Sequence, residues 1–96
     1  MLLSEVALGD MYEINHAQYM EKAPAGKHST KGCGRNVPNM SQSRKLLDTD
    51  VVVPLGKQVD AKLSAGTSLL YNEFIVYDVA QIRMRYLLRM RFHYKW

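Results

Sequence analysis

Cysteine is almost absent from this sequence of 96 residues, which has a single one, Cys33. A disulfide within the chain is therefore excluded, and a structural zinc site would need several cysteines or histidines at close spacing. The three histidines, His16, His28 and His93, stand at no recognised ligand spacing with Cys33 or with one another, so we expect no metal. This cysteine usage favours an intracellular, reducing compartment.

Long hydrophobic runs are also lacking. No apolar stretch approaches the roughly 18 residues that span a bilayer. Glu5 interrupts residues 1–8, the one stretch that could be mistaken for the core of a signal peptide. We therefore expect neither a membrane span, nor secretion, nor a membrane partner.

The composition is that of a folded domain. The length allows one domain, and 47% hydrophobic with 23% charged residues argues against a disordered tail or a coiled coil. The sequence thus predicts a single domain with a buried core. A formal net charge of +4 is compatible with a polyanionic partner, but many domains without one carry such a charge.

Alternating hydrophobicity identifies the strands. Over residues 82–94, apolar side chains occupy the even positions and basic ones the odd positions, with Leu87 as the exception. Period two is a strand signal, because a helix would distribute the arginines around its circumference. A second strand, 69–77, is rich in aromatic and β-branched residues, and we expect it to pair antiparallel with 82–94 across the short connector 78–81.

The remaining elements are short. Further strands are expected at 2–8, 28–33 and 49–53, and helix signals are limited to one turn around 16–21. Glycine and proline concentrate in the long connector 21–39 and in two shorter ones. The predicted fold class is mainly β, with antiparallel strands.

Two glycine-containing motifs look like phosphate loops and fail as such. Gly26-Lys27-His28-Ser29 lacks the earlier glycine of a Walker A loop, since position 21 is glutamate. Gly32-Cys33-Gly34 lacks the third glycine of a dinucleotide fingerprint, since position 37 is valine. Nothing in the sequence places a base beside Cys33, so a nucleophilic cysteine is not expected.

The basic face of 82–94 leaves two interpretations open. Its arginines, about 7 Å apart along one edge, have a spacing that can follow the phosphates of a nucleic acid. No aromatic residue stands among them to stack on bases, which favours a solvated face or one paired with acidic side chains of the protein.

Glu73 is the residue that local structure does not explain. Alternation places its carboxylate among aromatic and aliphatic side chains of 69–77. Burying an unpaired carboxylate is costly, so such a residue either finds a partner or lines a cleft. A salt bridge to the arginines of the neighbouring strand and a catalytic role are both open at this point.

The segment Leu-Leu-Tyr-Asn-Glu-Phe-Ile-Val-Tyr at 69–77 closely resembles the strand that carries the catalytic glutamate in the poly(ADP-ribose) polymerases, which are diphtheria-toxin-like ADP-ribosyltransferases. Other segments resemble the same family in the family's order: 3–13, 26–32, 53–56 and 86–88. The resemblance covers nearly the whole chain. It implies that residues 1–96 are the C-terminal half of a catalytic domain that is α+β when complete, with the donor-site half upstream.

The resemblance also implies an activity, the transfer of ADP-ribose from NAD to protein acceptors, with elongation of poly(ADP-ribose) chains. NAD is then a donor substrate, and no metal is implied. Glu73 would be catalytic, contacting the 2′-hydroxyl of the nicotinamide ribose, while the remaining NAD contacts would lie outside this chain. Tyr71 and Leu70 match acceptor-side positions, although both residue types are also ordinary in a packed core.

Partners and location follow from the same resemblance. It implies protein acceptors and poly(ADP-ribose) as partners, DNA binding through other domains of the full-length protein, and a nuclear role in DNA repair. The upstream half of the catalytic domain would itself be a partner, and we expect this chain alone to be inactive. The alternative left open by the residues is a non-catalytic β-rich module that binds nucleic acid or poly(ADP-ribose) through the basic C-terminal strand.

Overall fold

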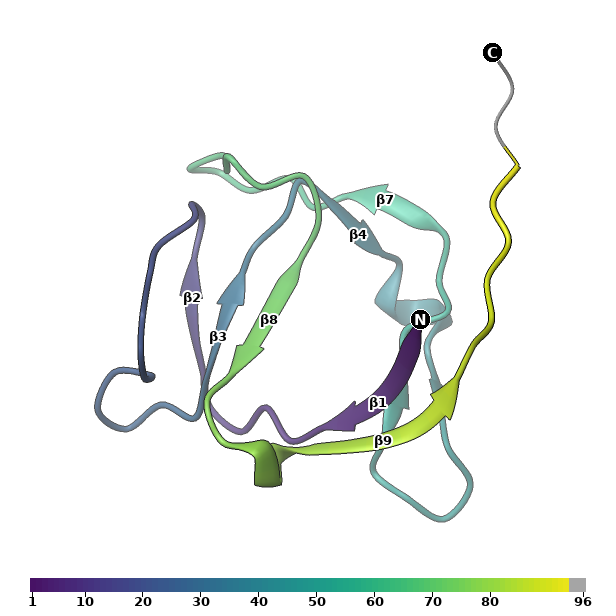
Figure 1. Ribbon diagram of the computed structural model, residues 1–96. Coiled ribbons are helices and arrows are strands. Elements are labelled where there is room, and N and C mark those ends of the chain that lie inside the picture. The colour runs from purple at the N-terminus through teal and green to yellow at the C-terminus, as the bar shows by residue number, and fades with distance from the viewer. Residues whose placement is uncertain (94–96) are drawn as a thin grey trace.

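The computed structural model describes residues 1–93, and Figure 1 shows the path of the chain. Within these residues there is no α-helix, only two single 3₁₀ turns, η1 (Met40–Gln42) and η2 (Val79–Gln81). The predicted fold class, mainly β with antiparallel strands, is confirmed. The strands are β1 (Leu2–Val6), β2 (Met11–Ile14), β3 (Ser29–Gly32), β4 (Asn36–Pro38), β5 (Arg44–Lys45), β6 (Val52–Val53), β7 (Gln58–Asp60), β8 (Glu73–Val76) and β9 (Ile82–Leu87).

A three-stranded sheet, β2-β3-β8, forms one side of the molecule (Figure 1). Its central strand β3 pairs in parallel with β2 and antiparallel with β8. Ser29 and Thr30 of β3 are fully buried, and Gly32 at its end lies opposite Glu73 of β8. The middle of this sheet is therefore built from small and polar residues.

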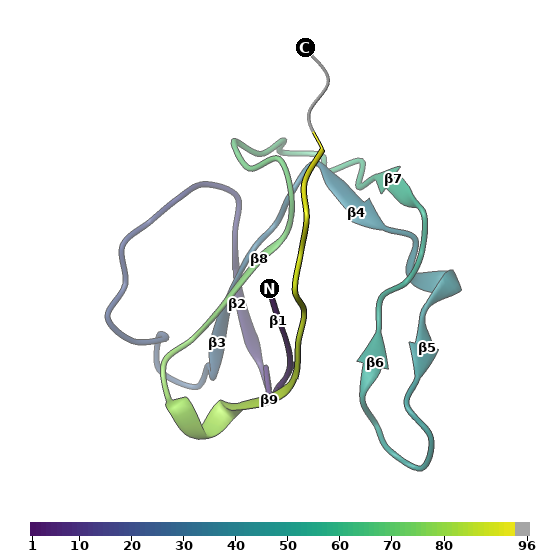
Figure 2. The same ribbon diagram turned by 45° about the vertical axis from the view of Figure 1, so that its right-hand side comes forward.

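A two-stranded ribbon, β1-β9, joins the two ends of the sequence. The strands are antiparallel, and Leu2 pairs with Leu87 while Val6 pairs with Ile82. The register shifts between Leu3 and Ser4, and this bulge leaves Arg85 without a partner across the ribbon. Two further antiparallel pairs, β4-β7 and β5-β6, make up the rest, and Figure 2 shows the β5-β6 hairpin extending away from the sheet.

The predicted pairing of 69–77 with 82–94 is wrong, because β8 pairs with β3 and β9 pairs with β1. The connector between them forms η2, whose capping box joins Asp78 and Gln81. The Gln81 side chain also donates to the carbonyl oxygens of Ala7 (3.0 Å) and His28 (2.9 Å). These bonds direct the chain out of the sheet, so a tight hairpin cannot form.

All five predicted strands are shorter in the structure. The segment 2–8 is a strand over Leu2–Val6, and 28–33 over Ser29–Gly32. The segment 82–94 is a strand only as far as Leu87, because Leu88 makes the last backbone bonds with Met1 and the chain beyond has no paired strand within residues 1–93. Position 94 lies outside the described residues. The segment 69–77 is a strand only over Glu73–Val76, and 49–53 only over Val52–Val53.

The helical turn expected at 16–21 is also wrong, because this segment has no regular structure. A single turn fixes several backbone dihedrals for one hydrogen bond and is unstable without packing. Here the preceding residue, Asn15, is instead held by Thr67, whose hydroxyl donates to its carbonyl oxygen at 2.9 Å.

The predicted buried core is the largest correction. No hydrophobic side chain within residues 1–93 is buried, and Leu47, Met84 and Leu87 are 91%, 69% and 80% exposed. The solvent-accessible surface is 8354 Å², whereas a compact protein of this mass exposes roughly 5,600 Å². The apolar residues are present but face outward from thin sheets, which have no second layer to pack against.

Candidate active site

Glu73 is the first residue of β8, and its side chain is exposed. Its partner across the sheet is the buried Gly32. A Cβ at position 32 would lie 2.6 Å from Cδ1 of Leu69 and 3.6 Å from Cβ of Glu73. A side chain at position 32 would therefore displace the end of the Leu69 side chain, whereas its distance from Glu73 would be that of an ordinary van der Waals contact.

The segment before Glu73 is pressed against a second glycine. A Cβ on Gly34 would lie 2.2 Å from the carbonyl carbon of Tyr71, and such a contact requires the backbone to move. The Gly34 N–H donates to Oδ1 of Asn72 at 2.9 Å. This backbone-to-backbone contact fixes where β8 begins, and hence where the Glu73 carboxylate lies.

Further hydrogen bonds hold the same segment to the strand that follows β3. The N–H groups of Arg35 and Asn36 donate to the carbonyl oxygens of Leu69 (3.0 Å) and Leu70 (2.9 Å). The Thr67 hydroxyl donates to the carbonyl oxygen of Cys33 at 2.7 Å and also accepts from the N–H of Leu69. Residues 67–72 therefore form an irregular but fully bonded approach to Glu73.

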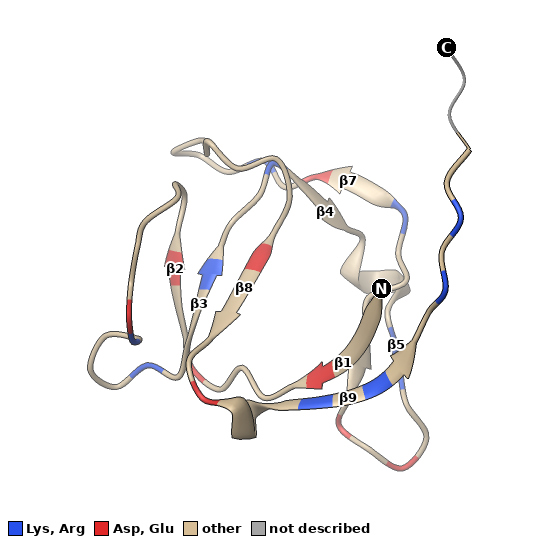
Figure 3. Ribbon diagram, viewed as in Figure 1, with Lys and Arg blue, Asp and Glu red and all other residues tan. Residues whose placement is uncertain are grey.

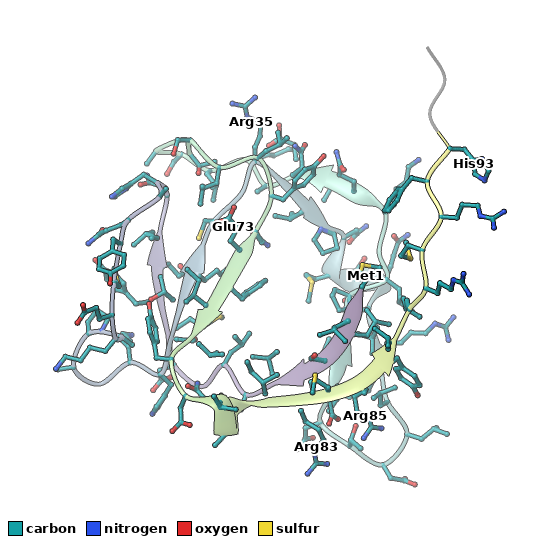
Figure 4. All side chains as sticks on the ribbon, in the orientation of Figure 1. Met1, Arg35, Glu73, Arg83, Arg85 and His93 are labelled. Atoms are coloured by element: carbon teal, nitrogen blue, oxygen red, sulfur yellow. The ribbon has the colours of Figure 1, made fainter. Side chains whose placement is uncertain are left out.

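The Glu73 carboxylate itself makes no ion pair and no hydrogen bond within residues 1–93. The arginines considered as its partners are engaged elsewhere, since Arg83 and Arg85 lie 4.0 and 3.7 Å from Glu5 Oε2. Figure 4 shows Glu73 on β8 and the two arginines on the outer side of the β1-β9 ribbon. The hypothesis of a salt bridge from Glu73 to the last strand is wrong for this structure.

Leu70 and Tyr71 each expose 54% of their surface. Tyr71 forms an isolated parallel bridge with Asn36, outside any named strand. Neither side chain is packed into a core, so their exposure leaves both free to meet another surface beside Glu73.

Other kinds of site have little support within residues 1–93. No group of three histidine, cysteine, aspartate or glutamate side chains converges there as a metal would require. The described chain holds no helix of the length and hydrophobicity needed to cross a bilayer. Cys33 is partly buried and is a free thiol.

Comparison with known proteins identifies the family. The sequence profile of the poly(ADP-ribose) polymerase catalytic domain matches residues 1–92. The chain belongs to the poly(ADP-ribose) polymerase family. It is 58% identical over 95 residues to poly(ADP-ribose) polymerase 1 of Oryza sativa subsp. japonica, a match that covers 99% of this chain and 10% of the relative.

Other poly(ADP-ribose) polymerases are similarly related. Poly(ADP-ribose) polymerase 1 of Xenopus laevis is 53% identical over 95 residues, covering 99% of this chain and 9% of the relative. Poly(ADP-ribose) polymerase 2 of Arabidopsis thaliana is 53% identical over 96 residues, covering 99% of this chain and 15% of the relative. The chain thus spans about a tenth of the length of poly(ADP-ribose) polymerase 1 of Oryza sativa subsp. japonica.

Sequence reasoning missed the residues that position Glu73 in this poly(ADP-ribose) polymerase segment. The sequence indicates only an incomplete dinucleotide motif at Gly32 and Gly34, whereas in the structure Gly34 packs against the backbone of Tyr71 and Gly32 faces the Leu69 side chain. Thr67, placed in a connector, bonds three separate backbone groups. Two glycines at alternate positions, just after a polar strand, were the available signal, since that spacing puts both on one face.

Proposed function

We propose that this chain supplies the glutamate-bearing part of an NAD-dependent protein ADP-ribosyltransferase that also elongates poly(ADP-ribose). The observation that carries the proposal is the exposed Glu73 carboxylate, which has no partner within residues 1–93, while the backbone just before it is packed closely against Gly34. A carboxylate with no structural partner is available for chemistry. Membership of the poly(ADP-ribose) polymerase family supports the reaction class.

The chemistry of glycosidic cleavage explains why a carboxylate is needed. When nicotinamide leaves the ribose of NAD, the glycosidic carbon acquires positive charge in an oxocarbenium-like transition state. Glu73 would accept a hydrogen bond from the 2′-hydroxyl of that ribose and stabilise the developing charge.

The acceptor would approach from the side of Leu70 and Tyr71. Both are exposed immediately before Glu73 and offer an apolar surface and a phenol. During elongation, the same carboxylate would act as general base on the incoming ribose hydroxyl. One residue thus serves cleavage and transfer.

The uncovered apolar surface supports a second part of the proposal. The chain exposes about 2,700 Å² more than the roughly 5,600 Å² expected for a compact protein of its mass. An area of that size is typical of an obligate interface. The remainder of the catalytic domain would cover it and complete the NAD site, so we expect the isolated chain to release no nicotinamide.

Partners beyond the domain follow from the same function. Protein side chains and poly(ADP-ribose) ends would be the acceptors. DNA binding through other domains, and a nuclear location in DNA repair, are part of this proposal and not properties of residues 1–96 alone.

The test replaces Glu73 in the complete catalytic domain. Glu73→Gln preserves size and removes the charge, so nicotinamide release in a single turnover should fall roughly 10²- to 10³-fold. The melting temperature should change by no more than about 1 °C, because the carboxylate has no partner to lose.

A matched control is Glu13→Gln in the same sheet. Glu13 lies on β2 and pairs only with Lys31, at 3.7 Å on the surface. We expect its turnover to equal that of the unmodified domain. A Glu73→Gln protein with normal turnover but lowered melting temperature would refute the catalytic role.

A further inference from the structure

An open cavity on the surface, separate from Glu73, lies where β8 ends and η2 begins, and most of its lining residues are exposed. It has a volume of about 600 Å³, and its lining includes Lys22, Lys27, His28, Tyr77, Asp78 and Gln81. Tyr77 follows the end of β8, four positions after Glu73, so the cavity lies roughly 13 Å from the candidate active site. Figure 1 shows the loop between β2 and β3 and the η2 turn meeting at this end of the sheet.

The His28 ring is fixed in the cavity wall. Its Nδ1 accepts a hydrogen bond from the N–H of Asp10 at 3.0 Å. The neutral ring must therefore carry its proton on Nε2, which remains a donor. Gly9 allows this placement, because a Cβ there would lie 2.5 Å from Nδ1.

The two lysines are cations without counter-ions. Neither Lys22 nor Lys27 forms an ion pair or a side-chain hydrogen bond within residues 1–93. A tight turn precedes Lys27, whose N–H donates to the carbonyl oxygen of Pro24 at 3.0 Å, with Gly26 at φ 79°. Figure 3 shows basic residues on this loop.

The side chains of Gln81 and Asp78 in the cavity already form hydrogen bonds within the protein. The Gln81 amide donates to Ala7 and His28, and its Oε1 accepts from the N–H groups of Tyr77 and Asp78. The Asp78 carboxylate, the one acidic group of the lining, accepts from the N–H of Ala80 at 2.9 Å. The groups left to bind a ligand are two ammonium ions and one imidazole N–H, and these suit an anion.

We propose that this cavity, defined by Lys22, Lys27 and His28, binds the pyrophosphate of an ADP-ribose unit in the polymer, as an exosite distinct from the active site. The identity of the polymer rests on the proposed function. A pyrophosphate carries two negative charges for two lysines and fits a hollow of this volume. A nucleic acid backbone instead needs a longer row of cations than the two lysines of this cavity.

The first test measures binding to the full-length protein in the absence of NAD, so that no turnover occurs. The probes are inorganic pyrophosphate and defined ADP-ribose oligomers, titrated by calorimetry. Lys22→Ala with Lys27→Ala should weaken both about tenfold or more, since two charge-assisted bonds are lost. The control pair Lys45→Ala with Lys57→Ala removes the same charge from exposed lysines outside the cavity and should change binding less than twofold.

Equal weakening by both pairs would overturn the proposal, because only overall charge would then matter. The proposal would also be overturned if single-stranded DNA competed with ADP-ribose oligomers at equal affinity and depended equally on Lys22 and Lys27. The cavity would then be a general phosphate site. Because the experiment measures binding and not catalysis, its result does not depend on whether Glu73 is catalytic.

A variant that is expected to bind more tightly gives a result that a folding defect cannot produce. Asp78→Asn removes the one negative charge of the lining, and asparagine is an equally good cap for η2. Pyrophosphate should bind roughly two- to fivefold more tightly, with the gain shrinking at high salt. Unchanged affinity would contradict the proposed position of the anion.

Discussion

The three-stranded sheet and the β1-β9 ribbon are built on opposite principles. The sheet buries Ser29 and Thr30 and holds its neighbours by hydrogen bonds and glycine contacts. The ribbon has apolar side chains along both strands, yet every residue of β9 is exposed and only Glu5 of β1 is partly covered. The difference teaches that the centre of the sheet is covered by its neighbours within residues 1–93, while the ribbon leaves the apolar side chains of both strands exposed.

Gly34→Ala should have the largest effect on the sheet. The added Cβ would meet the Tyr71 backbone, which cannot yield as a side chain does. We expect a loss of about 3 kcal/mol in the free energy of unfolding of the complete domain, measured by urea titration. Gly66→Ala is the control, since it meets no atom within 4 Å and carries only the strain of φ 69°, about 1 kcal/mol. Equal losses would show that the close approach is unimportant.

Thr30→Val tests the polar interior of the same sheet. Thr30 is 1% exposed, and its hydroxyl oxygen lies 2.8 Å from Oη of Tyr77. Its removal leaves the partly buried phenol of Tyr77 without its closest partner, and we expect a loss of about 2 kcal/mol in the free energy of unfolding, measured by thermal unfolding.

The double variant Thr30→Val with Tyr77→Phe should recover part of this loss, because no unsatisfied hydroxyl remains. Strictly additive losses would argue that the two hydroxyls do not interact.

Glu5→Gln tests the ribbon and should have the smallest effect. Glu5 is 21% exposed and lies near two arginines that are 74% and 40% exposed. We expect a loss of no more than about 1 kcal/mol, smaller still in high salt. Melting curves at low and high salt measure it. If the loss in the free energy of unfolding were as large as for Thr30→Val, the ion pairs of Glu5 would be a major source of the ribbon's stability.

The sequence predicted strand positions better than strand partners. Alternation located β9 and the β-branched content located β8, because both signals are local. Pairing was missed, since it depends on the Gln81 side chain reaching Ala7 and His28, which are distant in sequence. The strand β2 carried too short a pattern to be seen.

The candidate site was predictable only through resemblance. Glu73 stood out as an unexplained carboxylate, but its lack of a partner became clear only when Glu5 was found beside Arg83 and Arg85. The buried core was wrongly expected because composition reports how much apolar material is present and not whether a second layer exists to cover it.

The pairing of Leu2 with Leu87 also constrains when the chain can fold. Contacts between residues so distant in sequence form slowly, because closure of the long intervening loop costs entropy before any contact compensates it. During synthesis at roughly 5–20 residues per second, the apolar strand β1 waits several seconds for β9 to be made. Through that interval β1 is an unpaired strand with exposed leucines, and we expect the nascent chain to be prone to association with other chains.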